Sequence, residues 1–429
     1  MSSSAYSQQK ISPTSDLASF VTGATGFVGG ELLVQLLTTS PRSVICLVRA
    51  NNSAHAAERG TSRLAELLGA TEASRYLDRV RWVQGDLASD QFGWSPAQWS
   101  AMASTVDEIF HSAASVSFDL PLGDAHEINV CGTKRVHALA EAAQQAHGGF
   151  RRFHHVSTAY VAGTTKGLVD PNFLPSDSET AYRNTYERTK ARAERWLRCR
   201  ASHQVPVTIH RPSIIAGNTV TGATTSWNVM YVPMRMIAQG ALPVFARGGR
   251  QLVDCVGVDF VARSIAAFAD IDTAPLAAHH LTAGPSAMTT THVMKRTGEL
   301  AAAAGAKPSR VTMLSTRQFA ALVLCVRGVA AIPGAVAERV RLRKLRSKCR
   351  LALRALSKCA VYLPYSSVDT IFCLGDDAQL LREFNIEMPP AATYFDTVCR
   401  YALDAQFGKR PMTPIDVRVA VDIDPAPVQ

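Results

Sequence analysis

A phenol and a primary ammonium group lie four residues apart in the chain, at Tyr186 and Lys190. On a helix this spacing places both side chains on the same face. A nearby cation stabilises a phenolate and lowers the pKa of a tyrosine from its ordinary value of about 10. Such a phenol can protonate an oxygen that becomes negative as a hydride arrives. We therefore predict that Tyr186 and Lys190 are catalytic.

The alternative interpretation is an exposed helical pair, because Tyr6 and Lys10 have the same spacing. The position of Tyr186 favours catalysis. Tyr186 starts an expected helix 28 residues after Thr158, which lies at the end of an expected strand.

Three glycines spaced by three residues follow the first expected strand and open a helix. Glycine lets the backbone turn tightly and approach a pyrophosphate, whose charge the helix N-terminus favours. A strand-ending glycine turn is the alternative, but the position between strand and helix favours a dinucleotide site. The predicted site comprises Gly23, Thr25, Gly26, Phe27, Val28 and Gly29.

Further cofactor contacts are expected where the next strands end. Arg49 lies 20 residues after Gly29, and no acid occurs between residues 43 and 57. An acid there typically binds the ribose 2′-hydroxyl of NAD, whereas an arginine suits the 2′-phosphate of NADP. NADPH is therefore the predicted cofactor, and a solvent-facing arginine is the alternative. After the third and fourth strands, the predicted contacts are Asp86, Leu87, Ser112 and Ala113.

The pattern of elements predicts an α/β fold, a doubly wound parallel sheet of the Rossmann type with a mostly helical C-terminal cap. Short β-branched runs alternate with helical patterns as far as about residue 281, and beyond it we expect helices and no strong strand. We predict a disordered tail at 1–16, an NADP-binding domain at 17–285 and a helical substrate or cap domain at 286–429. The expected strands are 19–21, 43–48, 80–83, 108–111, 152–156 and 207–210.

Several other classes of site are disfavoured. The nine cysteines are scattered without a C-x-x-C pair, so neither a zinc site nor a disulfide framework is expected. His154 and His155 alternate faces on a strand and cannot both reach one ion, so we predict that they are structural and that no metal is bound. No Gly-x-Ser-x-Gly elbow occurs, which removes the usual hydrolase nucleophile.

Taken in order, these motifs resemble those of extended short-chain dehydrogenases/reductases. The motifs are Gly23-x-x-Gly26-Phe27-x-Gly29, Ser157-Thr158, Tyr186-x-x-x-Lys190 and Arg211-Pro212. Within that superfamily the chain is most similar to the thioester-reductase and fatty acyl-CoA reductase branch, which has a male-sterility-type NAD-binding domain. The matching segments of that branch are 47–50, 111–114, 155–161 and 210–214.

The resemblance implies a role for several residues. Thr158 takes the place of the residue that binds the substrate carbonyl, and Ser157 is a neighbour with a lesser role. Lys190 would bind the nicotinamide ribose as well as tune Tyr186. Ser213 would contact the cofactor. Asn129 matches a superfamily residue that holds a water in a proton relay, although a helix N-cap fits the sequence equally well.

The resemblance also implies a function: NADPH-dependent reduction of an acyl thioester, carried on coenzyme A or on a carrier protein, to an aldehyde. Whether a second reduction to an alcohol follows is left open. One alternative is an NADP-dependent ketone, steroid or sugar-nucleotide dehydrogenase or epimerase of the same fold. Another is a non-catalytic NADP-sensing protein that binds partners through its cap.

A strongly basic segment dominates the net charge of +10. Residues 339–358 contain nine Lys or Arg and no acid, and apolar residues recur there at steps of three or four, which predicts an amphipathic helix with a basic face. A solvated face, an anionic acyl carrier and the surface of an anionic membrane are the alternative explanations. Nucleic acid is not expected, because the segment lacks aromatic side chains for stacking. With no signal peptide and no spanning segment expected, the predicted location is cytoplasmic, with peripheral membrane contact as an option.

Overall fold

The computed structural model describes residues 17–247, 252–271, 274–332, 344–350, 353, 365 and 369–412. Its centre is a seven-stranded sheet in the order β12-β7-β5-β4-β1-β2-β3, in which all neighbouring strands are parallel. The strands are β1 (Ala18–Thr22), β2 (Val44–Val48), β3 (Val80–Gln84), β4 (Val106–His111), β5 (Arg152–Val156), β7 (Val207–Pro212) and β12 (Leu276–Leu281). The six predicted strands and the doubly wound fold are confirmed, and β12 is an additional edge strand.

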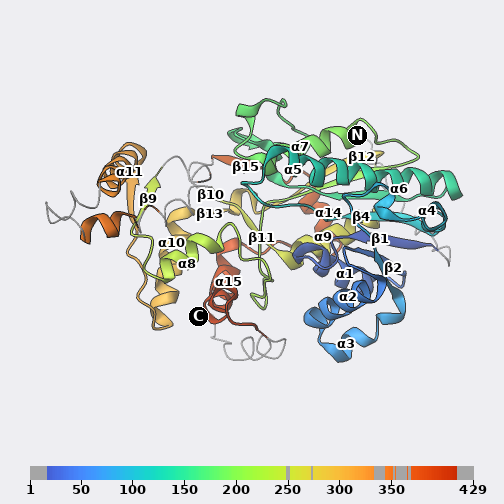
Figure 1. Cartoon of the computed structure of the whole chain (residues 1–429), viewed down its shortest axis with the longest axis horizontal. Helices are drawn as coiled ribbons and strands as arrows, with labels where there is room; N and C mark the ends of the chain where they lie inside the picture. The colour runs from blue at the N-terminus through green and yellow to red at the C-terminus, as the bar shows by residue number, and fades with distance from the viewer. Residues whose placement is uncertain are drawn as a thin grey trace.

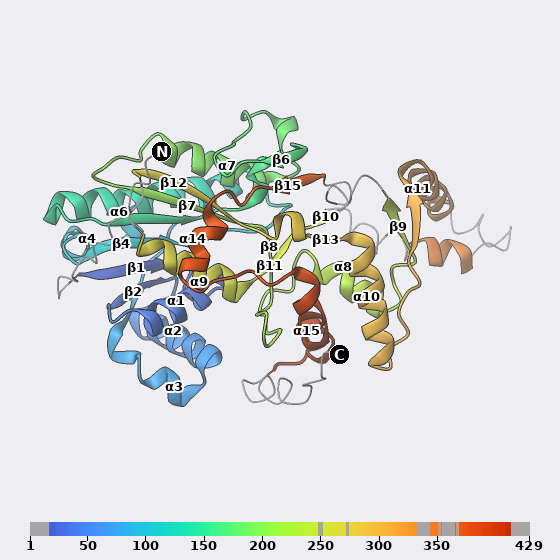
Figure 2. The ribbon, with the colours of Figure 1, turned by 180° about the vertical axis from the view of Figure 1, so that it is seen from behind.

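Helices cover both faces of this sheet (Figures 1 and 2). One face is packed by α1 (Phe27–Thr39), α2 (Ser53–Leu68) and α9 (Val258–Ala269), and the other by α4 (Pro96–Ala103), α6 (Gly132–His147) and α7 (Thr185–Arg198). Central strands buried on both faces require near-continuous apolar runs. β2, with the sequence Val-Ile-Cys-Leu-Val, is buried at every residue.

A second apolar core lies outside the seven-stranded sheet. It is built mainly by α8 (Tyr231–Ala238), α10 (Thr290–Ala303) and α15 (Ala391–Asp404). α15 contacts a segment that lies earlier in the sequence than the predicted cap. The hydroxyl of Tyr394 donates a hydrogen bond to the carbonyl of Cys255 over 2.8 Å. α14 (Asp377–Glu383) lies against the sheet, where Asp377 bonds to His279 of β12 over 2.7 Å.

Short strands also occur in the C-terminal region, where we expected no strong strand. They are β13 (Met288–Thr289), β14 (Thr312–Ser315) and β15 (Thr370–Phe372), and they pair with β10 (Leu252–Val253), β9 (Val244–Arg247) and β6 (Gly167–Val169). Pieces of two to four residues are too short to show a period of two, and their pairing depends on distant segments. Further elements are α3 (Ala70–Ser74), α5 (Leu122–His126), α11 (Thr316–Ala331) and the pair β8 (Ile214–Ala216) with β11 (Cys255–Gly257).

A buried ionic network joins β7 to the two elements that carry Thr158, Tyr186 and Lys190. Glu194 of α7 accepts hydrogen bonds from the guanidinium of Arg211, at the end of β7, over 2.6–3.2 Å. The hydroxyl of Ser157, after β5, donates to the same carboxylate over 2.5 Å. The side chains of Glu194 and Arg211 are 0% exposed, so each charge depends on the other for its solvation.

The substitution Arg211→Met should therefore strongly destabilise the fold. It leaves the carboxylate of Glu194 buried without its main partner, and such losses cost about 3–5 kcal/mol. Urea unfolding followed by circular dichroism measures the change. The matched control is Arg192→Met on the same helix, whose ion pair with Asp177 is partly exposed and should contribute less than about 1 kcal/mol.

A double variant tests whether the unpaired buried charge causes this loss of stability. Glu194→Leu combined with Arg211→Met removes both charges and should be more stable than Arg211→Met alone. If the two losses simply add, the buried charge is not the source of the effect.

Candidate active site

The predicted site residues meet in one cleft of about 1060 Å³ beside the carboxyl ends of β1, β4, β5 and β7. It is lined by every residue predicted to contact the cofactor: Gly23, Thr25, Gly26, Phe27, Val28, Gly29, Arg49, Asp86, Leu87, Ser112, Ala113, Lys190 and Ser213. Thr158 and Tyr186 line the same cleft. Of the predicted site residues, Asn129 alone lies outside this lining.

The glycine turn has the shape of a cradle for an anion. Gly23 has a positive φ of 80°, and a Cβ there would lie 2.8 Å from the backbone nitrogen of Ala113. A Cβ on Gly29 would lie 2.2 Å from the carbonyl oxygen of Gly23. α1 begins directly after this turn with no acid in its first turn and no side-chain cap. The backbone amides at its N-terminus therefore suit a pyrophosphate, and the residues fit a dinucleotide.

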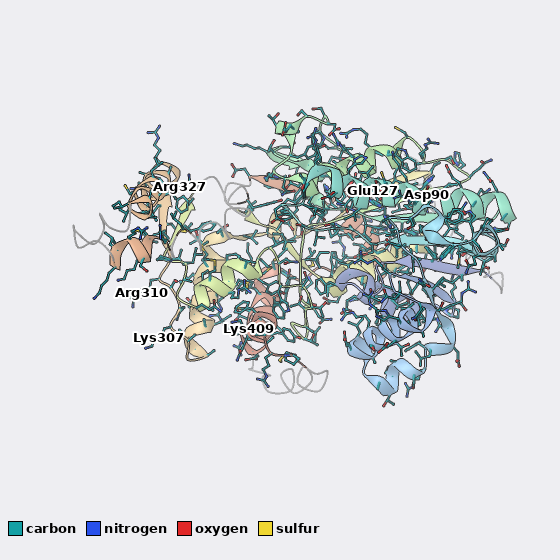
Figure 3. All side chains as sticks on the ribbon, viewed as in Figure 1. Asp90, Glu127, Lys307, Arg310, Arg327 and Lys409 are labelled. Atoms are coloured by element: carbon teal, nitrogen blue, oxygen red, sulfur yellow. The ribbon has the colours of Figure 1, made fainter. Side chains whose placement is uncertain are left out.

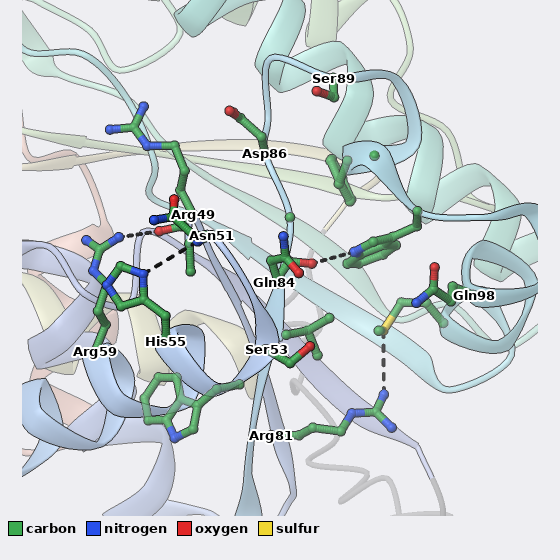
Figure 4. A pocket seen from close by; sticks show the side chains of 18 of the residues that line it. Arg49, Asn51, Ser53, His55, Arg59, Arg81, Gln84, Asp86, Ser89 and Gln98 are labelled. Atoms are coloured by element: carbon green, nitrogen blue, oxygen red, sulfur yellow. Dashed lines mark hydrogen bonds between the residues drawn. The ribbon is translucent and has the colours of Figure 1, made fainter.

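Basic side chains gather where the adenosine end of such a dinucleotide would lie (Figure 4). Arg49 and Arg59 line the cleft and also a neighbouring cavity of about 980 Å³. The guanidinium of Arg59 donates to the backbone carbonyl of Arg49, which fixes the two residues together. Asp86 lies on the loop after β3 and lines both hollows. The sequence analysis missed Arg59, although its place ten residues after Arg49, on the helix that follows β2, was a usable signal.

Tyr186 opens onto the cleft at the start of α7. Burial raises the pKa of Tyr186 to about 12, and a hydrogen bond with the Thr158 side chain opposes this shift only in part. The phenol is therefore neutral near pH 7 and can act as a hydrogen-bond donor. Thr158 lies 4% exposed at the end of β5, and its hydroxyl also accepts from the backbone of Tyr160 over 3.3 Å.

Lys190 is buried, and its ammonium group points at the sheet. Its Nζ donates to the carbonyl oxygen of Val156 over 2.7 Å and lies 3.3 Å from Nε2 of His155. Burial lowers the pKa of Lys190 to about 8, against a smaller opposing effect of the Glu194 charge. We expected Lys190 to lower the pKa of Tyr186, and that expectation is wrong for this structure. Burial dominates the shift, and the charge of Lys190 is not among its causes, since the ammonium nitrogen is engaged by β5.

Neutral histidines lie beneath Lys190. Burial lowers the pKa of His155 well below its usual range, and the charge of Lys190 lowers it further. Burial likewise lowers the pKa of His111 to about 3, and this ring bonds to Thr22 and Thr133 over 2.7 and 3.0 Å. Within the described ranges, no three His, Cys, Asp or Glu side chains gather as metal ligands.

Asn129 holds the loop after β4 against α7. Its amide exchanges two hydrogen bonds with the backbone of Ser115, over 2.8 and 3.1 Å, and donates to Thr189 over 3.0 Å. The alternative of a helix N-cap is wrong. The helix begins earlier, at α5, and passes through a π turn (Glu127–Cys131) into α6, so Asn129 lies in the middle of it.

An aromatic residue from the C-terminal region completes the wall beside Tyr186. The hydroxyl of Tyr365 donates to Glu187 over 2.5 Å and accepts from the Asn184 amide over 2.8 Å. Its ring stacks on Phe118, which in turn lies 5.8 Å from the ring of Tyr186. The sequence analysis missed these residues. No local pattern links Tyr365 to Glu187, which lies 178 residues earlier in the chain.

Comparison with known proteins agrees with the glycine turn and the parallel sheet. A family model described as male sterility protein matches residues 21–265. The chain is 31% identical to a linear gramicidin synthase component of Brevibacillus parabrevis over 260 residues, 59% of this chain and 5% of that protein. It is 27% identical to a putative fatty acyl-CoA reductase of Drosophila melanogaster over 278 residues, 57% of this chain and 50% of that protein. The chain thus matches half or less of the length of these relatives.

A solved structure extends the likeness of the fold to the C-terminal region. The terminal R domain from the myxalamid PKS-NRPS biosynthetic pathway superposes with a TM-score of 0.72 and 21% identity, over 93% of this chain and 94% of that one. At this identity the likeness concerns the fold.

The buried ammonium group should leave a signature in the pH dependence of stability. Because the folded pKa of Lys190 is about 8 against an ordinary value of 10.5, the unfolded chain binds the additional proton between these values. The free energy of unfolding of the wild type should therefore rise with pH from 8 to 10, by up to about 1.4 kcal/mol per pH unit from this group. Lys190→Met should lack this rise.

The measurement is urea unfolding of both proteins at pH 7, 8, 9 and 10. The matched control is Lys166→Met, which replaces an exposed lysine and should keep a constant offset from the wild type. A constant offset for Lys190→Met as well would show that the ammonium group is not buried in solution.

Proposed function

The chain belongs to the male sterility protein family of NAD-binding domains, and on that premise we propose that it is an NADPH-dependent reductase that converts an acyl thioester into an aldehyde. The observation that carries the proposal is that the side chains of Thr158 and Tyr186, each with a hydroxyl, line the same cleft as the glycine turn. Two neutral donors at one point suit a carbonyl oxygen that becomes negative.

The roles of the catalytic residues follow from their protonation. Bound NADPH would supply the hydride. Thr158 and Tyr186 would donate hydrogen bonds to the thioester oxygen, and they would stabilise its negative charge before the carbon–sulfur bond breaks and the thiol leaves. Tyr186 suits this role because its raised pKa keeps its proton in place until a strong acceptor forms. In the balanced reaction, thioester, NADPH and one proton give aldehyde, thiol and NADP.

The substrate end of the cleft supports an acyl chain over a nucleotide sugar. Its side chains are largely apolar or aromatic: Val116, Phe118, Ile128, Ile215, Trp227, Val229 and Tyr365. Such a lining offers few partners for sugar hydroxyls, whereas an acyl chain is bound by burial alone. The matched proteins are described as part of a linear gramicidin synthase and as a putative fatty acyl-CoA reductase. We therefore propose coenzyme A or a carrier protein as the thiol carrier.

The cofactor residues are assigned on the same basis. We propose that residues 17–285 form the cofactor-binding domain, that Gly23, Gly26 and Gly29 approach the pyrophosphate, and that Arg49 and Arg59 bind the 2′-phosphate of NADPH. Arg63 supports this set, because it also lines the cleft and is held by Glu66 and Thr225. Three arginines around one end favour the additional charge of NADPH over NADH.

Replacing Tyr186 tests the reaction. Tyr186→Phe removes one of the two donors and should lower the rate of aldehyde formation by about 10²–10⁴-fold, while NADPH still binds. NADPH consumption at 340 nm with medium- and long-chain acyl-CoA and with a carrier-protein thioester, followed by product analysis, measures this and separates aldehyde from alcohol.

Tyr76→Phe is the matched control, because this hydroxyl bonds to Glu72 away from the cleft and its loss should leave the rate unchanged. Full activity in Tyr186→Phe would overturn the assignment of roles. Turnover of ketones or UDP-sugars without turnover of thioesters would instead support the dehydrogenase or epimerase alternative.

Replacing the arginines tests the choice of cofactor. Arg49→Ala combined with Arg59→Ala removes two charge-assisted contacts and should raise KM for NADPH by about 10–100-fold, with KM for NADH nearly unchanged. Arg81→Ala is the control, since Arg81 lines only the neighbouring cavity and bonds to Met102. Equal losses with both cofactors would contradict a 2′-phosphate site.

A further inference from the structure

The helix α11 is largely apolar. It begins with a capping box formed by Ser315 and Gln318, and its 16 residues include no charged side chains except Arg317 and Arg327. Phe319 and Ala330 are buried, 8% and 6% exposed. The opposite face is exposed and consists of Ala320, Ala321, Leu324, Cys325, Gly328 and Ala331 together with Arg317, Gln318 and Arg327. Leu324 is 67% exposed.

Few described elements cover this helix. Its main packing partners are β9 and β14, at the end of the molecule away from the seven-stranded sheet (Figures 1 and 2). An exposed apolar patch rimmed by polar residues marks a site that contacts a partner or a membrane. We therefore expect the exposed face of α11 to contact another molecule or a membrane.

The charges around α11 have one sign. Residues 304–332 carry Lys307, Arg310, Arg317 and Arg327 and no acid. The helical residues 344–350 add Lys344, Arg346, Lys348 and Arg350, again without an acid, and expose Leu345. None of these eight cations forms an ion pair with a described residue.

The two segments lie together and form one surface. Nε of Arg350 donates to the carbonyl oxygen of Ala330, near the end of α11, over 3.3 Å. Figure 3 places Lys307, Arg310 and Arg327 at the same end of the molecule, remote from the acids Asp90 and Glu127. The other predicted basic-helix residues, 339–343, 351, 352 and 354–358, lie outside the described residues.

We propose that this surface, made of α11 and residues 344–350, docks on an anionic lipid bilayer with α11 lying in the plane of the interface. An anionic bilayer accepts both features together, because its acyl region takes the leucines and its headgroups attract the lysines and arginines. An acidic protein would pair with the positive charges but would leave the apolar helix face uncovered. α11 rises only about 24 Å over its 16 residues, and no helix among the described residues has the length and apolar character needed to cross a bilayer.

The test is co-sedimentation of the full chain with vesicles of phosphatidylcholine and phosphatidylglycerol in equal parts, and with vesicles of phosphatidylcholine alone. We expect binding to the anionic vesicles that weakens as salt is raised. Leu324→Asp should abolish most of this binding. Arg327→Gln should weaken it about fivefold, the effect of one charge near such a surface.

Matched controls separate the surface from general exposure. Leu168→Asp replaces a leucine that is 70% exposed on β6, and Arg75→Gln removes an exposed charge from the end of α3; neither should change binding. The proposal is overturned if anionic vesicles do not bind the chain, or if Leu324→Asp and Leu168→Asp behave alike. It is also overturned if Leu324→Asp leaves vesicle binding intact but dissociates a homodimer in light scattering. The readout uses no turnover, so it stands apart from the proposed reaction.

Discussion

The carboxylate of Glu194 holds together the three elements on which the cleft depends. It accepts hydrogen bonds from the guanidinium of Arg211, at the end of β7, and from the hydroxyl of Ser157, after β5. It lies one turn after Lys190 on α7. Thr158 follows Ser157 directly, so the same contact fixes the distance between the strand that carries one hydroxyl and the helix that carries the other. A buried ion pair contributes little net stability. Here it serves to set one relative position of β5, α7 and β7.

Burial then determines how the reacting groups are protonated. Removal from water disfavours charge, so the same surroundings raise the pKa of Tyr186 and lower that of Lys190. The two shifts bring the pair toward neutrality together. A phenol that keeps its proton is a donor rather than a base, which suits the stabilisation of a developing oxyanion. A dinucleotide bound in the cleft would bring ribose hydroxyls and phosphates close to Lys190 and give its charge new partners.

Much of the fold and the cofactor turn could be predicted from the sequence, because both depend on local patterns. Buried parallel strands show as apolar runs, and a positive φ at a tight approach requires glycine at Gly23. What failed depends on distant contacts. β12 has the sequence Leu-Ala-Ala-His-His-Leu and resembles no buried strand, and it is buried because His279 and His280 find partners at Asp377 and Cys373. The spacing between Tyr186 and Lys190 does not indicate how deeply Lys190 is buried.

The cap follows the same physical rule as the sheet, namely that apolar helix faces must be covered. α8, α10 and α15 cover one another and share a core around Met234, Leu300 and Phe395. α11 is equally apolar but lies beyond that core, and positive charge without acids surrounds it. A helix that merely extended the core would carry its polar residues outward, as α10 does with Lys295 and Glu299. In α11 the outward positions are instead mainly alanine, glycine and Leu324, with Arg317 and Arg327 among them, which suits both the acyl region and the headgroups of a bilayer surface.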